Sequence, residues 1–198
     1  MLDAKSCILM EFFLRGKSSK TCECRALDDM QNRMNNTGSF NHRETDMIDI
    51  RDVEAENFFD VCELTSNSNG IGTLLEEFVC CNAISLAESK FFPECEPKAL
   101  YFNETLIGFF MYKQIPGEYT EVELFRYMLD YKFIGKGLGR SSFEAMLSLF
   151  RNNGVTKVTL MIEESNLVAR KLYLSCGFSF TGKIEKGEHY YSLSLNND

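Results

Sequence analysis

Three glycines alternate with larger residues at 135–140, inside the stretch YKFIGKGLGRSSFEAML. Glycine tolerates positive φ and lets the main chain approach a ligand closely. The apolar periodicity that follows predicts a helix directly after the glycines. Main-chain N–H groups at a helix start bind anions, and Lys136 and Arg140 add positive charge. The stretch therefore predicts a site for the pyrophosphate of a nucleotide-like cofactor.

Two familiar phosphate-binding loops do not fit this stretch. A Walker A loop requires Gly-Lys followed by Ser or Thr, but Lys136 is followed by Gly137. A Rossmann fingerprint requires a glycine where Arg140 stands, and it follows the first strand of its unit. A plain glycine-rich turn remains the alternative to a cofactor loop.

A second stretch, NLVARKLYLSCGF at 166–178, has residues suited to a thin ligand and to proton transfer. Asn166 suits the N-cap of a helix, or a ligand contact. Ala169 and Tyr173 are four residues apart, so they share one helix face. Alanine leaves room for a ligand, and the tyrosine hydroxyl can donate a proton. The alternative for Tyr173 is a half-buried core aromatic.

The elements that must position these motifs alternate between strand and helix periodicity, which indicates a mixed α/β fold. Two β-rich runs around Asn103-Glu104 predict a hairpin at 98–113. The remaining predicted strands are 47–52, 121–129, 155–162, 178–184 and 189–195, and the predicted helices are 53–64, 71–89, 141–154, stopped by Gly154, and 166–177, stopped by Gly177.

Composition favours one soluble domain with a proper core, because the 198 residues are 44% hydrophobic and 25% charged. The apolar run Cys7–Leu14 contains Glu11, is too short to span a bilayer, and lacks the flanks of a signal peptide. We therefore expect a cytoplasmic protein.

The cysteines and histidines do not have the spacing of a zinc site, so no metal is expected. Most of the eight cysteines are interpreted as small hydrophobic residues. The net charge of −8 falls entirely on 47–198, since 1–46 holds seven basic and seven acidic residues. This acidity argues against a nucleic-acid partner and favours cations, although it equally serves solubility.

Residues 1–46 are polar after the short apolar run and weakly periodic. They predict an N-terminal extension that is poorly ordered or loosely attached, followed by one domain at 47–198. A second hypothesis makes Met47 the true first residue, after an over-long gene prediction. N-terminal sequencing of the natively expressed protein distinguishes the two.

In this order and spacing, the two motifs resemble those of the GNAT N-acetyltransferase superfamily over about 47–198. The loop matches the family's Q/R-x-x-G-x-G/A pattern at Gly137 and Gly139, and 166–178 matches N-x-x-A-x-x-L-Y-x-x-x-G-F at every defined position. The resemblance implies an acyl-CoA N-acyltransferase fold, in which helices flank a central, mostly antiparallel sheet with a splayed parallel pair at the coenzyme site. It also implies acetyl-CoA as co-substrate.

The resemblance implies roles for individual residues. Main-chain N–H groups from Gly135 to Arg140 contact the pyrophosphate, and the strand that ends at Met128–Leu129 holds the pantetheine through backbone bonds. Tyr173 is the general acid for the departing thiolate. The expected coenzyme-binding residues are Met128, Leu129, Ile134, Gly135, Lys136, Gly137, Leu138, Gly139, Arg140, Asn166, Ala169 and Lys171.

Segments at 76–89, 98–112 and 178–184 are similar to the bacterial spermine/spermidine (diamine) N-acetyltransferases. This likeness implies a polyamine or diamine, such as spermidine or spermine, as the small-molecule substrate, without nucleic acid or membrane as partner. Relatives commonly dimerise, which leaves a homodimer open. The residues that carry the likeness are Asn82, Ser85, Leu86, Ala87, Pro97, Gly108 and Tyr112.

Acidic residues near the first of these segments are candidates to hold the distal cations of a polyamine. They are Glu76, Glu77 and Glu88, with Asn82 as a further substrate-binding candidate. The alternative for the three glutamates is a solvated helix face.

The sequence departs from the family pattern at two places. Ile134 stands where relatives have Gln or Arg, and Phe125 stands where they often have an acidic residue. Glu123, or ordered water, is therefore the candidate general base. Two alternatives remain open: a GNAT enzyme acting on an amino acid, an antibiotic or a protein N-terminus, and a non-catalytic acyl-CoA-binding module.

Overall fold

The computed structural model describes residues 47–195 except 70–75, 77–79 and 116. The predicted N-terminal extension at 1–46 lies outside the described residues and stays a prediction.

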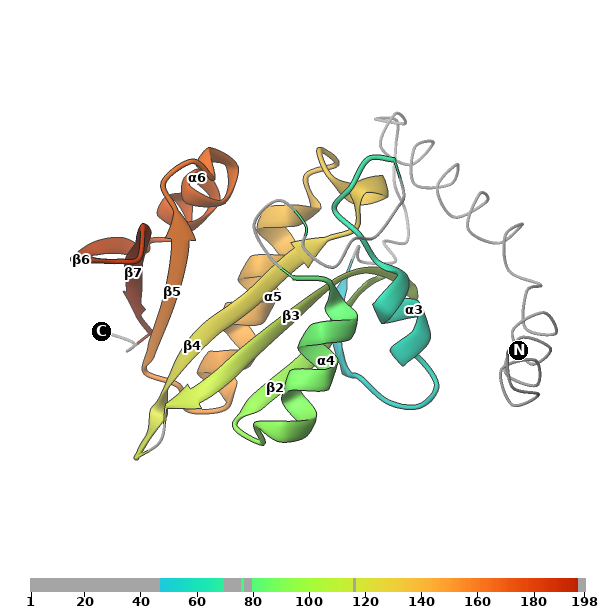
Figure 1. Ribbon diagram of the computed structural model, residues 1–198, viewed down its shortest axis with the longest axis horizontal. Helices are drawn as coiled ribbons and strands as arrows, with labels where there is room; N and C mark the ends of the chain where they lie inside the picture. Colours follow the sequence, from blue (N-terminus) through green and yellow to red (C-terminus); the bar gives the residue numbers. More distant parts are fainter. Residues whose placement is uncertain (1–46, 70–75, 77–79, 116, 196–198) are drawn as a thin grey trace, which may run out of the picture. The chain divides into compact units, whose positions relative to one another are not determined.

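The described strands form one seven-stranded sheet in the order β1-β2-β3-β4-β5-β7-β6 (Figure 1). Neighbouring strands are antiparallel except for the parallel pair β4–β5. The predicted mixed fold, with a mostly antiparallel sheet and one parallel pair, is confirmed. The strands are β1 (Ile48–Asp52), β2 (Cys95–Phe102), β3 (Thr105–Ile115), β4 (Glu118–Leu129), β5 (Lys157–Glu163), β6 (Ser179–Glu185) and β7 (Glu188–Ser194).

Helices cover both faces of this sheet, with α5 on one face and α3 and α4 on the other (Figure 1). None of the helices among the described residues has the length and apolarity to cross a membrane. The helices are α3 (Phe58–Glu63), α4 (Asn82–Phe91), the 3₁₀ turn η1 (Tyr131–Phe133), α5 (Leu138–Asn152) and α6 (Leu167–Ser175).

Two predicted helices are shorter in the structure than the sequence pattern suggested. The one expected at 53–64 begins at Phe58, because Asn57 closes a turn before it: its side chain accepts from the Glu54 N–H at 2.9 Å and donates to the Asp52 carbonyl at 2.9 Å. The one expected at 71–89 begins at Asn82, after Cys81 in extended conformation. Part of that prediction, 71–75 and 77–79, lies outside the described residues.

The predicted hairpin is confirmed as β2–β3. Its turn residues Asn103 and Glu104 have φ values of 45° and 64°, the left-handed geometry of a two-residue hairpin turn. The predicted helix stops also hold, since Gly154 and Gly177 follow α5 and α6 with φ values of 77° and 93°.

A β-bulge in β4 sets which side chains face which helix. Met111 of β3 lies opposite Arg126, but Tyr112 lies opposite Leu124, so Phe125 is an extra residue. As a result Tyr127 shares the α5 face of the sheet, where its ring centroid lies 5.1 Å from that of Phe143. Phe125 instead packs against the core on the α3–α4 face, which is formed by Val61, Leu64, Cys95, Ala99, Phe109, Met111 and Met128.

The parallel strands β4 and β5 separate just before this bulge. They pair only from Glu121–Leu124 to Lys157–Leu160, and β5 then continues beside β7 (Figure 1). From Phe125 to Leu129, therefore, β4 has no strand along its β5 edge among the described residues. The expected splayed pair is present, and it leaves main-chain groups available to a ligand.

Candidate functional site

The glycine loop joins the open end of β4 to the start of α5. Gly135 and Gly137 have φ values of 79° and 81°, which L-residues rarely adopt. A Cβ placed on either would meet no atom within 4 Å, and one on Gly139 would only touch Leu129 Cδ1 at 4.0 Å. Contacts within the described protein therefore do not exclude a side chain at these positions. The bare main chain fits a ligand that comes close to it.

Helix α5 begins without the usual side-chain cap. Its N-cap residue is Gly137, no side chain accepts from the first turn, and no acidic residue lies there. The first N–H groups of this 15-residue helix therefore have no intrahelical acceptor and carry the positive end of the helix dipole. This arrangement fits a phosphate group.

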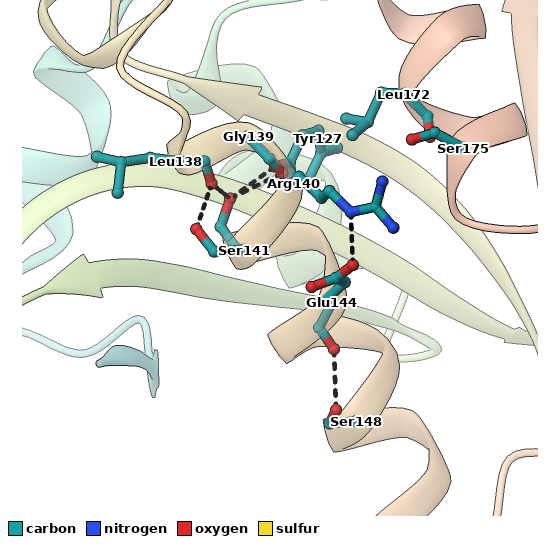
Figure 2. A network of polar contacts seen from close by, with 10 residues as sticks. Tyr127, Leu138, Gly139, Arg140, Ser141, Glu144, Ser148, Leu172 and Ser175 are labelled. Atoms are coloured by element: carbon teal, nitrogen blue, oxygen red, sulfur yellow. Dashed lines mark hydrogen bonds and ion pairs between the residues drawn. The ribbon is translucent and has the colours of Figure 1, made fainter. Parts of the chain in front are cut away.

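Two cations flank this helix start. Lys136 is half-buried, with Nζ 5.6 Å from the ring centroid of Phe133. Arg140 is exposed, and its Nε lies 2.7 Å from Glu144 Oε1 (Figure 2). Exposed pairs of this kind are weak, so Arg140 can exchange Glu144 for a phosphate. Ile134, 55% exposed, offers no polar side-chain contact.

Two buried hydroxyls hold the first turn of α5, and sequence reasoning missed both. The Tyr127 hydroxyl donates to the Gly139 carbonyl at 2.8 Å (Figure 2). It also lies 2.8 Å from Ser142 Oγ, which donates to the Leu138 carbonyl at 2.6 Å. Burial raises the pKa of Tyr127, so the phenol stays protonated. A usable signal was Ser142, which interrupts the apolar stripe of Leu138 and Met146 at four-residue spacing.

The end of β4 depends on a close approach by β3. A Cβ on Gly108 would lie 2.5 Å from the Met128 carbonyl oxygen and 2.7 Å from Leu129 Cδ2. Glycine at 108 thus lets the two strands pair up to Leu129. Met128 and Leu129 are themselves buried, so they offer a ligand main-chain groups rather than side chains.

Helix α6 carries the second motif. The Asn166 side chain accepts from the Ala169 N–H at 3.1 Å, so it caps the helix. Ala169 is half-buried, and Lys171 is exposed.

Tyr173 is buried where α6 meets α5. Its ring centroid lies 5.1 Å from that of Phe143 and 6.1 Å from that of Phe178. The hydroxyl has no hydrogen-bond partner among the described residues. Every fully buried side-chain oxygen or nitrogen in that part of the chain does have a partner. The Tyr173 hydroxyl therefore keeps some contact with solvent. Burial raises its pKa above the ordinary tyrosine value. The phenol is therefore protonated and free to donate.

The candidate base Glu123 lies on β4, two residues before the bulge. It is half-buried between Lys113 of β3 and Thr159 of β5. Its carboxylate makes no hydrogen bond or ion pair with the described residues. It is therefore available to accept a proton.

Glu76, a substrate-binding candidate, is engaged within the protein. The carboxylate is buried and accepts from Thr65 Oγ1 at 2.7 Å, from the Ser66 N–H at 2.8 Å and from the Ser66 hydroxyl. Thr65 also donates its N–H to Asp130 at 3.2 Å and accepts from the Tyr131 N–H at 2.8 Å. Glu76 thereby ties the loop after α3 to the start of the glycine loop.

The other substrate-binding candidates are scattered. Asn82 is buried and donates to the Val61 carbonyl at 2.9 Å, which joins α4 to α3. Glu88 lies 3.4 Å from Arg126, whose guanidinium also stacks on the Phe125 ring at 3.9 Å. Glu77 lies outside the described residues.

A hollow with acidic walls, absent from the sequence analysis, lies between the loop after β5 and the β6–β7 turn. Its residues come from two separate segments of the chain, 163–165 and 186–188, which no local sequence pattern joins. The lining residues are Glu163, Glu164, Ser165, Lys186, Gly187 and Glu188.

The remaining metal-binding and nucleophilic side chains in the described part of the chain form no further site. Among the described residues no group of three or more His, Cys, Asp or Glu side chains is placed to hold a metal ion. The described cysteines are free thiols, namely Cys62, Cys80, Cys81, Cys95 and Cys176.

Comparison with known proteins places this geometry in a family. The model of the Acetyltransferase (GNAT) family matches residues 68–178. The spermine/spermidine N(1)-acetyltransferase of Bacillus subtilis (strain 168) is 30% identical over 145 residues, which cover 70% of this chain and 91% of that protein.

Solved structures share the fold. The PaiA N-acetyltransferase of Thermoplasma acidophilum, in complex with coenzyme A, has a TM-score of 0.56 at 18% identity, over 75% of this chain and 99% of that one. The ribosomal-protein-S18-alanine N-acetyltransferase of Escherichia coli has a TM-score of 0.58 at 19% identity, over 77% of this chain and 96% of that one.

The matching family model spans more than half of the chain and includes both motifs, the glycine loop and Asn166–Phe178. The predicted resemblance is confirmed, and the chain belongs to the acetyltransferase (GNAT) family.

Proposed function

We propose that this protein transfers an acetyl group from acetyl-CoA to a primary amine, most favourably a polyamine such as spermidine or spermine. The observation that carries the proposal is the open edge of β4 from Phe125 to Leu129, which the glycine loop connects to the uncapped start of α5. A ligand with amides at one end and a pyrophosphate at the other suits this sequence of groups.

Coenzyme binding is assigned to main-chain groups. The N–H groups between Gly135 and Arg140 would hold the pyrophosphate, with Lys136 beside them, and the free edge at Met128 and Leu129 would pair with the pantetheine amides. Acetyl-CoA supplies an activated acyl group as a thioester. Ala169, half-buried on α6, leaves space for a thin chain.

The amine must lose a proton before it can attack, because a lysine-like amine has a pKa of about 10.4. Glu123, or a water next to it, accepts this proton, and the main-chain N–H near Leu129 polarises the thioester carbonyl. The new C–N bond forms as the C–S bond breaks. Tyr173 donates its proton to the departing sulfur. Its raised pKa keeps the phenol protonated before this step.

A polyamine is favoured by two observations. The Bacillus subtilis relative at 30% identity acts on spermine and spermidine, as its name states. The hollow lined by Glu163, Glu164 and Glu188 offers carboxylates for distal ammonium groups. Since Glu76 is engaged by Thr65 and Ser66, this hollow is the stronger candidate for cation binding.

A thiol-release assay tests the proposal. Purified protein with acetyl-CoA is given spermidine, spermine or putrescine, and in parallel an amino acid, an aminoglycoside and a peptide with a free N-terminus. We expect the polyamines to give the highest kcat/KM. Faster release with another amine would reassign the substrate, and coenzyme binding without release from any amine would indicate a non-catalytic acyl-CoA-binding module.

A further inference from the structure

The hydroxyls of Tyr127 and Ser142 act on the one turn of α5 that the proposed function uses. Tyr127 donates to the Gly139 carbonyl at 2.8 Å (Figure 2), and Ser142 donates to the Leu138 carbonyl at 2.6 Å. Ser141 adds a longer bond to the Leu138 carbonyl, at 3.2 Å. Both carbonyls of the first turn are therefore held by side chains.

Fixing these carbonyls also fixes two N–H groups. A peptide unit is planar, so the Leu138 carbonyl shares its plane with the Gly139 N–H, and the Gly139 carbonyl shares its plane with the Arg140 N–H. A hydrogen bond at a carbonyl also polarises its amide and strengthens the N–H as a donor. The two hydroxyls thus control the direction and strength of two donors to an anion.

The first turn of α5 needs such support. Gly137 at the N-cap provides no side-chain bond, and first-turn N–H groups have no intrahelical acceptor. Tyr127 is anchored by its position in β4 and by its T-shaped ring contact with Phe143, at 5.1 Å between centroids. Ser142 is fully buried.

Tyr127 also belongs to the open segment of β4, three residues beyond Leu124, the last residue that pairs with β5. The same five residues of strand thus expose main chain on one edge and send a hydroxyl to the α5 turn. This connection sets the spacing between the two parts of the site.

We propose that Tyr127 and Ser142 are positioning residues for the coenzyme's pyrophosphate: they orient the Gly139 and Arg140 N–H groups and tie them to β4. The proposal rests on the proposed function as far as the ligand is concerned. The acetyl-transfer chemistry itself is left to Tyr173 and Glu123.

Calorimetry with two ligands tests this role. Coenzyme A contains the pyrophosphate, whereas pantetheine ends before it. We expect Tyr127→Phe and Ser142→Ala each to weaken coenzyme A binding about five- to tenfold, the size of one neutral hydrogen bond. Pantetheine, measured at millimolar concentration, should bind both variants as it binds the wild type.

Tyr112→Phe is the matched control. Tyr112 is also a buried tyrosine facing α5, but it packs on Phe150 near the far end of the helix, with ring centroids 4.9 Å apart, and it donates to Glu96. Its removal should leave the affinity for coenzyme A unchanged. Circular dichroism of each variant establishes that it is folded.

The backbone amide NMR chemical shifts of Gly139 and Arg140 in the ligand-free protein give a second readout, because they report the hydrogen bonding of the attached carbonyls. These shifts should change in Tyr127→Phe and Ser142→Ala and stay in place in Tyr112→Phe. Unchanged shifts and unchanged coenzyme A affinity would overturn the positioning role. Equal losses for coenzyme A and pantetheine would also overturn it, since the hydroxyls would then support the site as a whole. A wild-type protein that binds no coenzyme A would instead refute the proposed function, with the shift comparison still reporting on the two hydroxyls.

Discussion

The Tyr173 hydroxyl combines burial with the lack of a hydrogen-bond partner among the described residues. Burial raises its pKa, since a phenolate there would lose its hydration. Such a group holds its proton through the neutral range. Tyr173 therefore has a proton to donate at the moment when the thiolate leaves.

We expect Tyr173→Phe to lower kcat by about 10²-fold or more, the usual contribution of a general acid. The affinity for coenzyme A should stay near the wild-type value, because the ring contacts with Phe143 and Phe178 remain. Steady-state kinetics and calorimetry measure the two quantities. A kcat equal to that of wild type would remove Tyr173 from the mechanism.

Single residues differ in how far the sequence could predict them. Asn166 was predictable as a helix cap, because its partner Ala169 is three residues away. Glu76 was not, because its partners Thr65 and Ser66 come together with it only through the fold of a loop. The sequence does not show which groups contact the Glu76 carboxylate. A substrate-binding role for Glu76 therefore could not be distinguished from a structural role by sequence alone.

Among the helices and strands, α5 has a left-handed glycine at each end. Gly137 at its start and Gly154 after its end have φ values of 81° and 77°, and a Cβ on either meets nothing within 4 Å. The two glycines therefore carry equal conformational demands but lie at opposite ends of one helix. Comparing variants at the two glycines therefore distinguishes an effect on stability from an effect on coenzyme binding.

We expect Gly137→Ala and Gly154→Ala to destabilise the protein similarly, by about 1–2 kcal/mol each, the cost of a left-handed L-residue. Only Gly137→Ala should weaken coenzyme A binding. Urea unfolding and calorimetry on both variants give the comparison. Equal coenzyme affinity in the two variants would count against the glycine loop as the pyrophosphate site.

The bulge in β4 explains why part of the site was not predicted. An ideal strand would place Tyr127 on the same face as Phe125, opposite to Leu124. The extra residue moves Tyr127 to the face of α5, where it meets Ser142. Sequence periodicity cannot show a bulge, since it depends on the register with β3. The resemblance to polyamine acetyltransferases included Gly108 but gave no reason for a glycine there. The structure gives the reason, since a Cβ at this position would lie 2.5 Å from the Met128 carbonyl oxygen.

Across the whole molecule, tyrosine hydroxyls with raised pKa values should make the fold less stable at alkaline pH. Burial is the largest cause of the raised pKa of Tyr112, Tyr127 and Tyr173. A raised pKa in the folded state means that the unfolded chain releases these protons first as pH rises. The stability from these groups is therefore complete below the unfolded pKa of about 10 and is lost as pH rises toward their folded values.

We expect the melting temperature to be nearly constant from pH 7 to about 8.5 and to fall steeply above about pH 10. The raised pKa values of Cys62, Cys95 and Cys176 act in the same direction and begin the decline earlier. Thermal melts across this range measure the effect, and Tyr112→Phe should reduce the slope. A melting temperature that does not change between pH 9 and 11 would contradict the argument.

The domain division at Met47 stays a prediction. The Bacillus subtilis relative is covered over 91% of its length by 70% of this chain, so part of this chain has no counterpart in it. The described residues from 47 onward contain the sheet and both motifs.

Because β4 and β5 separate after Leu124, the two halves of the sheet are joined by a short stretch of strand pairing. Within the sheet, strands β1 to β4 join strands β5 to β7 through the four register pairs from Glu121 to Leu124, extended by the Thr156 N–H, which donates to the Thr120 carbonyl at 2.8 Å. A coenzyme lying along the free edge would occupy the place of a missing neighbour and splice the two halves together. Since Phe143 of α5 already packs on Tyr127 on one side and on Tyr173 and Phe178 on the other, the coenzyme would reinforce an existing connection, and the empty protein should separate along this line more easily than the loaded one.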